Sequence, residues 1–295
     1  MMTKIAYLGP KGTFTEVAAK AVFPNDERVP FTSIPDCMDG VSNGAVQFAV
    51  VPIENAIEGS VNLTLDYLLH NKKLLINGEI VVPIEQHLLI HTNYIHNWAN
   101  IEKVYSHPHA IAQCHKFLRS MLPNAQLEYM NSTGAAAEYV AKHPNEPIAA
   151  IGNHLAAKQY QLEIAQDSVH DYDNNHTRFV ILRNEKSVLS DTSPLYTGDK
   201  TTLMVTLPAD YPGALHHVLS AFAWRKLNLS KIESRPMKTG LGNYFFVIDV
   251  DMKMDDVLIP GVIAELEALK CQVSLLGSYP CFSLLKKENE IIVET

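Results

Sequence analysis

The sequence has few cysteines, no excess of basic residues and no long apolar segment. Only four of its 295 residues are cysteines, without a CxxC pair, which indicates reduced thiols in a cytoplasmic protein. Lysine and arginine total 24 against 32 acidic residues, a formal net charge of -8, so no basic stripe suggests a nucleic-acid partner. No apolar run approaches membrane-spanning length, and residues 4–8 are typical of a first strand instead of a signal peptide. The cysteines are Cys37, Cys114, Cys271 and Cys281.

Strand-like and helix-like segments alternate through the first 183 residues. Hydrophobic residues make up 47% of the chain, enough for a large core divided over two or three domains. We expect strands over residues 5–9, 47–53, 79–91, 104–105 and 148–152, and helices over 13–22, 62–70, 110–121, 133–142 and from about 155. Repeated strand–loop–helix units predict an α/β fold with mostly parallel sheets. Ligands bind beyond the strand ends in such sheets, where the polar clusters of this sequence fall.

The C-terminal third follows a different pattern. A polar stretch over residues 184–200 is typical of a linker. After it, residues 201–280 follow the order β-α-β-β-α-β, a ferredoxin-like layout. Its strands are predicted over 201–207, 229–237, 244–250 and 273–279, and its helices over 213–227 and 257–270. Residues 240–243 supply a hairpin turn, and 281–295 form a C-terminal tail.

The pair Thr177-Arg178 stands between polar residues and an apolar run. A threonine hydroxyl donates or accepts a hydrogen bond, and arginine grips a carboxylate through two hydrogen bonds. Together they suit a reaction in which a small carboxylic acid is held while a hydroxyl leaves. The alternative is a polar turn that opens a strand.

Ordered motifs carry a resemblance to a known family. In the first 183 residues they are Gly9-Pro10-Lys11-Gly12-Thr13-Phe14, Val51-Pro52-Ile53-Glu54-Asn55 with Gly59-Ser60-Val61, Ser106-His107-Pro108 with Gln113-Cys114, Ser132-Thr133 before an alanine run, and Thr177-Arg178-Phe179. The C-terminal region carries Gly213-Ala214-Leu215 and Glu233-Ser234-Arg235-Pro236. Over nearly its whole length the chain resembles monofunctional prephenate dehydratases with a C-terminal ACT domain. The departure is His109, where the family commonly has glutamine.

The resemblance implies a catalytic region over residues 1–183, built of two α/β lobes similar to type II periplasmic binding proteins. The active site would lie between the lobes. Glu54, Asn55 and Ser60 would face it from one lobe and Ser106, Gln113, Ser132 and Thr133 from the other, with Thr177 and Arg178 near the crossover. The implied activity is the decarboxylating dehydration of prephenate to phenylpyruvate in phenylalanine biosynthesis, with no cofactor and no metal.

We hypothesise that Thr177 donates to or positions the leaving hydroxyl, with a protonated Glu54 as relay. Arg178 would clamp one carboxylate, and helix starts at Thr13 or at Ser132 and Thr133 would bind the other. Asn55, Ser106 and Gln113 would orient the substrate. Plainer alternatives stay open: Thr13 with Glu16, Ser132 and Thr133 as helix caps, and Asn55 as a turn residue. His107, His109 and Cys114 lack further ligands at a recognisable spacing, so metal binding there is not expected.

The resemblance also implies that residues 201–280 bind L-phenylalanine and mediate feedback inhibition. The implied residues are Gly213, Ala214, Leu215, Glu233, Ser234, Arg235 and Pro236. Such domains work in pairs, so we expect a homodimer or homotetramer. The alternative for Glu233 to Arg235 is an exposed strand end with a local ion pair. Two other functions remain open: an arogenate dehydratase, and a non-catalytic two-lobed sensor joined to an ACT domain.

Overall fold

The structure is a computed structural model that describes residues 3–70, 74–184, 189, 192–209, 211–236 and 244–285. The chain forms two compact units. The first comprises Met1–Lys72, Ile80–Val180 and Leu284–Thr295, and the second comprises Lys73–Glu79 and Ile181–Ser283. The turn predicted at 240–243 and residues 286–295 of the predicted tail lie outside the described residues. No described helix is long and apolar enough to cross a membrane.

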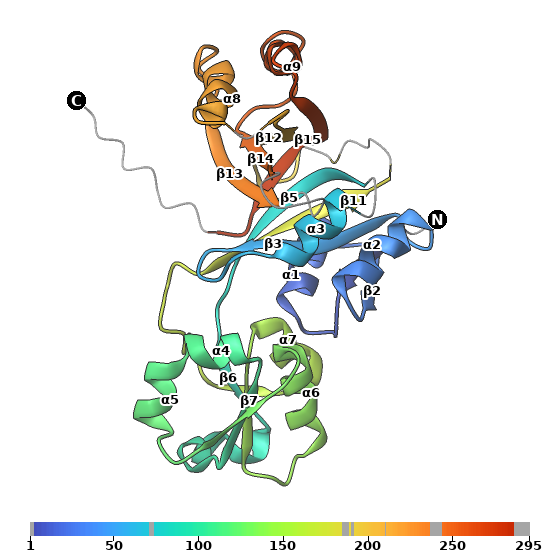
Figure 1. Cartoon of the computed structure of the whole chain (residues 1–295). Helices are drawn as coiled ribbons and strands as arrows, with labels where there is room; N and C mark the ends of the chain where they lie inside the picture. The colour runs from blue at the N-terminus through green and yellow to red at the C-terminus, as the bar shows by residue number, and fades with distance from the viewer. Residues whose placement is uncertain are drawn as a thin grey trace, which may run out of the picture. The chain divides into compact units, whose positions relative to one another are not determined.

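The first lobe of the first unit is a sheet with the strand order β11-β3-β1-β2, on which α1, α2 and α3 pack (Figure 1). Strand β1 is central and pairs in parallel with β2 and β3, and the short β4 pairs antiparallel with β3. The elements are β1 (Lys4–Leu8), α1 (Phe14–Val22), β2 (Glu27–Phe31), α2 (Ile34–Ser42), β3 (Phe48–Asn55), β4 (Gly59–Ser60), α3 (Asn62–His70) and β11 (His176–Arg183).

The second lobe is a five-stranded sheet with the order β10-β6-β9-β7-β8. Its apolar residues form two clusters, one of which includes Ala110, Ile111 and Leu118 from α4 and α5, and the other Ala136 and Ala156 from α6 and α7. The elements are β6 (His87–Ile90), the 3-10 helix η1 (Thr92–Asn100), β7 (Lys103–Ser106), α4 (Pro108–Gln113), α5 (His115–Met121), β8 (Gln126–Tyr129), α6 (Thr133–Lys142), β9 (Ile148–Gly152), α7 (His154–Tyr160) and β10 (Glu163–Gln166). The predicted two-lobed α/β region is confirmed.

Side-chain caps fix the helix starts that border the cleft between the lobes. The Thr13 hydroxyl accepts a hydrogen bond from the Glu16 amide at 3.4 Å, and the Ser132 hydroxyl accepts one from the Ala135 amide at 3.0 Å. The capping interpretations of Thr13 and Ser132 are therefore confirmed. Gly134 lies so close to the first lobe that an added Cβ would come within 2.4 Å of the Lys11 carbonyl oxygen. The second residue of α6 consequently must be small.

Two predicted elements are divided in the structure. The strand predicted over 79–91 is divided between β5 (Leu75–Pro83) and β6, with a non-strand crossover between them. In the crossover, Ile84 donates its amide to the Asn175 carbonyl and Gln86 donates its amide to His170 Nδ1, so these groups bond to the returning chain. The helix predicted at 110–121 is α4 and α5, because Cys114 has non-helical dihedral angles.

The second unit contains the predicted β-α-β-β-α-β succession. Its sheet has the order β13-β14-β12-β15, and β14 and β15 both pair antiparallel with β12. Together with α8 and α9 the strands enclose one apolar core. The elements are β12 (Tyr196–Thr206), α8 (Ala214–Ala223), β13 (Leu229–Pro236), β14 (Tyr244–Val250), α9 (Leu258–Ala268) and β15 (Gln272–Ser283).

The start of β12 shortens the predicted linker of residues 184–200. Tyr196 pairs with Phe282 and Gly198 pairs with Cys281, so the strand begins before the apolar residues that marked it in the sequence. The second unit also includes the first half of β5, which no sequence signal assigned to it. The domain limits at 183, 200 and 280 stay predictions.

A buried ion pair lies within the second unit. Lys200 Nζ is 2.9 Å from Glu79 Oε1, and the Glu79 side chain is only 1% exposed. Nearby, the Thr202 hydroxyl donates to Asp249 at 2.7 Å and bonds to the Tyr279 hydroxyl at the same distance.

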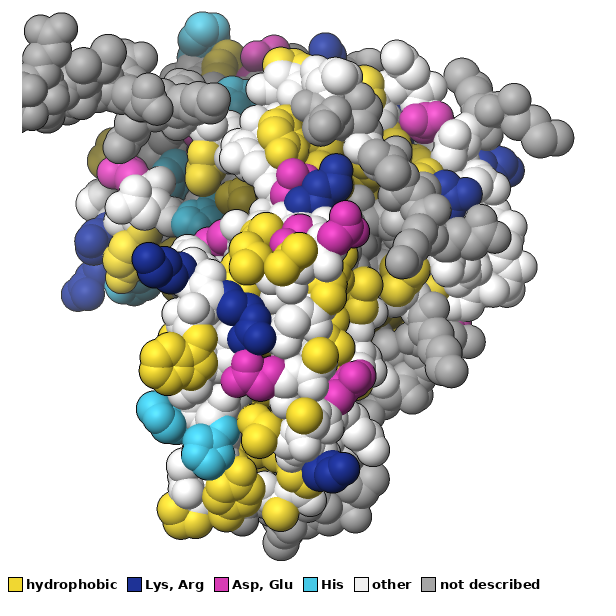
Figure 2. Space-filling view, turned by 90° about the horizontal axis from the view of Figure 1, so that it is seen from above, with side chains coloured by type: hydrophobic (Ala, Val, Ile, Leu, Met, Phe, Trp, Pro, Cys, Tyr) yellow, Lys and Arg dark blue, Asp and Glu magenta, His cyan; other side chains and the backbone are white. Residues whose placement is uncertain are grey.

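On the face shown in Figure 2, acidic and basic side chains are interspersed among the described residues, in keeping with the absence of a basic stripe in the sequence.

Candidate active site

Thr177 and Asn55 form a polar contact between β11 and the end of β3. Asn55 Nδ2 lies 2.9 Å from Thr177 Oγ1, although 122 positions separate the two residues. Asn55 Oδ1 accepts the amides of Ile57 and Glu58 at 2.9 and 3.0 Å, which fixes the orientation of the side-chain amide. Asn55 is therefore the donor and Thr177 Oγ1 the acceptor. The hydrogen of the Thr177 hydroxyl remains available for a group in the cleft.

Thr177 lines a cavity of about 480 Å³ between the two lobes. This volume is within the range of roughly 300–1,000 Å³ that small-molecule sites occupy. Predicted site residues supply much of its wall, from both lobes: Thr13, Asn55, Ser60, Gln113, Ser132, Thr133 and Thr177. A larger cavity of about 780 Å³ shares Thr13, Thr15, Asn131 and Ser132 with it and reaches Lys11. The structure thus brings together polar residues that are far apart in the sequence.

Two helix starts border this cleft. Thr13 at the start of α1 and Ser132 with Thr133 at the start of α6 are among its lining residues. Such helix ends favour anions, because their first amide groups point outward and carry partial positive charge. No lysine or arginine belongs to the described lining of the 480 Å³ cavity. The cleft is therefore suited to a carboxylate that is held mainly by amide and hydroxyl groups.

Titratable side chains face the same cavity from both lobes. His109 Nδ1 of α4 is 3.7 Å from Glu58 Oε2 of the first lobe, and His107 is the N-cap of α4. Burial lowers the pKa of His107, and the neighbouring His109 lowers it further, while Glu58 acts in the opposite direction. We therefore expect a neutral His107 imidazole near pH 7.

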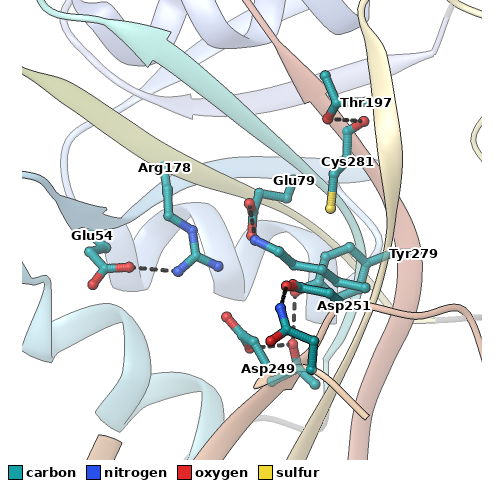
Figure 3. Close-up of polar contacts among 11 residues, drawn as sticks. Glu54, Glu79, Arg178, Thr197, Asp249, Asp251, Tyr279 and Cys281 are labelled. Carbon is teal, nitrogen blue, oxygen red and sulfur yellow. Dashed lines mark hydrogen bonds and ion pairs between the residues drawn. The ribbon is translucent and has the colours of Figure 1, made fainter. Parts of the chain in front are cut away.

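Arg178 and Glu54 pair with each other outside this cavity. Their side chains meet at 2.6 Å between Arg178 NH1 and Glu54 Oε2, as Figure 3 shows. Neither residue is among those that line the cavity, whereas Thr177 and Phe179 are. The reason is the alternation of side chains along a strand, which turns Arg178 away from its two neighbours. In this structure the two side chains pair with each other, and the clamp expected of Arg178 and the relay expected of Glu54 stay predictions.

Ser106 lies behind the cleft wall and is fully buried. Its hydroxyl donates to the Ile151 carbonyl at 2.8 Å, which ties the end of β7 to the neighbouring β9. The structure therefore gives Ser106 a bond within the second lobe, and its expected role in orienting substrate stays a prediction. Asn55, by contrast, combines both interpretations of the sequence, since it forms a local turn and reaches Thr177.

Gln86 is a lining residue that the sequence did not identify. It is 2% exposed, and its side-chain oxygen is buried without a hydrogen-bond partner among the described residues. A buried amide oxygen without a partner is costly, so this atom is a candidate acceptor for a ligand group. It lies in the polar triplet Glu85-Gln86-His87, which matches no motif that would have predicted a site. Other lining residues that were not assigned a role are Glu58, His107, His109 and Asn131.

The residues expected to bind phenylalanine lie on two elements of the second unit. Gly213 is the N-cap of α8 with φ 92°, a conformation that favours glycine. Ala214 is buried and Leu215 is 37% exposed. On the edge strand β13, Glu233 is paired with Lys231 at 3.1 Å and with Arg235 at 3.7 Å. Ser234 and Pro236 alternate with these residues and are exposed.

Taken together, these features define a class of protein: a two-lobed α/β binding region with a polar, anion-attracting interlobe cleft, in one chain with a ferredoxin-like unit. A family model for prephenate dehydratase matches residues 5–187. The chain belongs to the prephenate dehydratase family. The predicted family and enzyme class are confirmed.

Individual relatives agree over almost the full length. The chain is 55% identical to a prephenate dehydratase of Bacillus subtilis (strain 168) over 284 residues, which cover 95% of this chain and 100% of the relative. A crystal structure of prephenate dehydratase in complex with L-Phe from Arthrobacter aurescens is 36% identical, with a TM-score of 0.82 over 94% of this chain and 89% of that one. A structure described as GqqA, a quorum quenching acylase, is 26% identical with the same TM-score over 94% and 98%.

Proposed function

We propose that this protein converts prephenate to phenylpyruvate, carbon dioxide and water in the formation of phenylalanine. The observation that carries the proposal is the Thr177 hydroxyl, oriented by Asn55 at the wall of an interlobe cleft. Membership of the prephenate dehydratase family supports the same reaction and favours it over a non-catalytic sensor.

In the proposed reaction the ring carboxylate leaves as CO2, and the electron pair of the broken C–C bond enters the ring. The ring hydroxyl departs with one added proton as water, so the ring becomes aromatic. Thr177 donates a hydrogen bond to the departing oxygen, because its own oxygen already accepts from Asn55. Positioned acid assistance of this kind contributes about 10²–10⁴ in rate.

The two substrate carboxylates would be bound by the helix starts at Thr13 and at Ser132 and Thr133. Gln113 and Ser60 would orient the ring from opposite lobes. In this proposal the Arg178–Glu54 pair is a positioning element: it links β11 to β3 beside the Asn55–Thr177 contact. This role is an alternative to the direct clamp predicted for Arg178.

The decisive experiment incubates the purified protein with prephenate and measures phenylpyruvate against an enzyme-free blank. A parallel incubation with arogenate, followed by phenylalanine analysis, tests the alternative substrate. Rapid formation of phenylpyruvate that requires Thr177 supports the proposal. A rate indistinguishable from the blank, or a marked preference for arogenate, would contradict it.

We further propose that the second unit is an ACT domain through which L-phenylalanine inhibits the enzyme. The predicted βαββαβ succession and a 36% identical relative crystallised with L-Phe support this. The glycine at the start of α8 permits a close approach of ligand to backbone, and the exposed edge of β13 is suited to pairing with a second copy. A homodimer or homotetramer would follow, which light scattering measures directly.

The regulatory proposal has a matched test. Gly213→Ala introduces a side chain at φ 92°, so inhibition should require more phenylalanine than in the parent protein. Gly44→Ala is the control, because Gly44 has φ 77° and open space around it in the first unit. Equal inhibition of both variants would show that the Gly213 turn takes no part in binding phenylalanine.

A further inference from the structure

A separate cavity of about 440 Å³ lies within the first unit, formed by α1, α7 and the crossover between β5 and β6. In the described lining it shares only Phe14 with the interlobe cleft. Three potential metal ligands face it: Glu85 and His87 from the crossover and the start of β6, and His154 from the start of α7. One ligand atom from each of them lies within 4.8 Å of the other two.

His87 is the residue that distinguishes this cluster from a chance gathering of surface groups. Its side chain is 1% exposed, and its Nε2 is buried without a hydrogen-bond partner among the described residues. A buried ring nitrogen in this condition is energetically unfavourable unless a ligand engages it. The His87 and His154 rings lie with their centroids 4.0 Å apart, which brings a second imidazole to the same place.

The other nitrogen of His87 has the partner that metal-binding histidines usually have. Asp167 Oδ1 is 2.5 Å from His87 Nδ1, and the Ser168 amide donates to the same nitrogen at 3.0 Å. Two groups therefore engage Nδ1, and Nε2 is the ring nitrogen that stays available for a metal ion.

We propose that Glu85, His87 and His154 bind a divalent transition-metal ion, for which Zn²⁺ is the best match. Two imidazoles and one carboxylate form a known type of zinc ligand set, and three protein ligands leave one position for water. The alkaline-earth ions prefer oxygen ligands and fit this set poorly.

Closure around an ion requires only small movements. Zinc bonds to nitrogen and oxygen measure about 2.0–2.2 Å, so ligand atoms around one ion are closer together than 4.8 Å. His154 is 60% exposed and Glu85 is exposed, so both side chains can turn towards the fixed His87. The cavity provides the path by which an ion would enter.

The proposal is tested by titrating the full-length, tag-free protein with Zn²⁺ in competition with a chromophoric chelator. We expect one equivalent to bind. His154→Ala should weaken the binding, as should Glu85→Gln, and Asp167→Asn should weaken it about 10- to 100-fold, as is typical when the hydrogen-bond partner of a ligand is removed. His96→Ala is the control, since His96 is exposed on η1 of the same lobe.

Two results would overturn the assignment. One is the absence of stoichiometric binding by the parent protein. The other is binding that His154→Ala leaves unchanged, which would point to scattered surface histidines. The Co²⁺-substituted protein adds a readout that does not depend on turnover: its visible absorption should be that of a four- or five-coordinate ion and should be lost in His154→Ala. A six-coordinate spectrum would also contradict the proposal.

Discussion

Replacement of Thr177 by valine removes one hydroxyl from the interlobe cleft while conserving the shape of the side chain. The proposed role of that hydroxyl, as donor to the leaving oxygen, predicts that kcat falls by about 10²–10⁴, which corresponds to about 2.7–5.4 kcal/mol of transition-state stabilisation. The fold should lose much less. Asn55 Nδ2 carries two hydrogens and has two further acceptors, Asn175 Oδ1 at 3.0 Å and the His176 carbonyl at 3.3 Å.

Because both hydrogens of Asn55 keep a partner, the free energy of unfolding should fall by no more than the roughly 0.5–1.5 kcal/mol of one net hydrogen bond. The assay is phenylpyruvate formation under saturating prephenate, paired with urea denaturation of the same preparations. Thr177→Ser restores the hydroxyl and should recover most of the rate. Near-normal turnover by Thr177→Val would remove the hydroxyl from the chemistry. A loss of rate that merely follows a loss of folded protein would give it a structural role.

Three further outcomes follow from the geometry. His109→Gln introduces the residue common in the family and should keep kcat within a few-fold of the parent; a loss beyond 10² would make His109 part of the reaction. Lys200→Met removes the ammonium partner of the buried Glu79 and should lower the free energy of unfolding by about 3–5 kcal/mol, with much of it regained in the double variant Glu79→Leu/Lys200→Met; denaturation curves that coincide with the parent would refute this. The depressed pKa of His107 means that the unfolded state binds more protons once the pH falls below about 6.5, so stability should be complete above that pH and decline on acidification. His107→Gln should flatten this dependence between pH 7.5 and 5.5 relative to His96→Gln, and equal slopes would exclude His107 as its source.

Local signals in the sequence were sufficient for most helices and strands. Thr13 and Ser132 predicted the starts of their helices because the caps are formed by residues three positions apart. The β-α-β-β-α-β order was predictable for a similar reason, because apolar periodicity and turn residues are signals within short segments of the sequence. The break between β5 and β6 within residues 79–91 could not be predicted from the sequence. The backbone amides of this crossover form hydrogen bonds with Asn175 and His170, which lie on a distant part of the chain.

The sequence predicted which residues lie near the candidate site better than it predicted which way their side chains point. Asn55, Gln113 and Thr177 do line one cleft. Arg178 does not line this cleft. Its side chain pairs instead with Glu54 on the neighbouring strand, a contact that the sequence alone does not predict. Gln86 was missed because the polar triplet Glu85-Gln86-His87 matches no motif, and the burial of Gln86 depends on tertiary contacts.

The place of β11 beside β3 has a consequence for synthesis on the ribosome. Asn55 emerges 122 residues before its partner Thr177, and the whole second lobe is translated between them. At about 5–20 residues per second this interval is roughly 6–24 s. During that time the nascent first sheet presents the apolar flank of β3 without its neighbour, while the second lobe has all its strands available to fold. Protection of this exposed flank by a chaperone would therefore matter most while residues 87–166 are being synthesised.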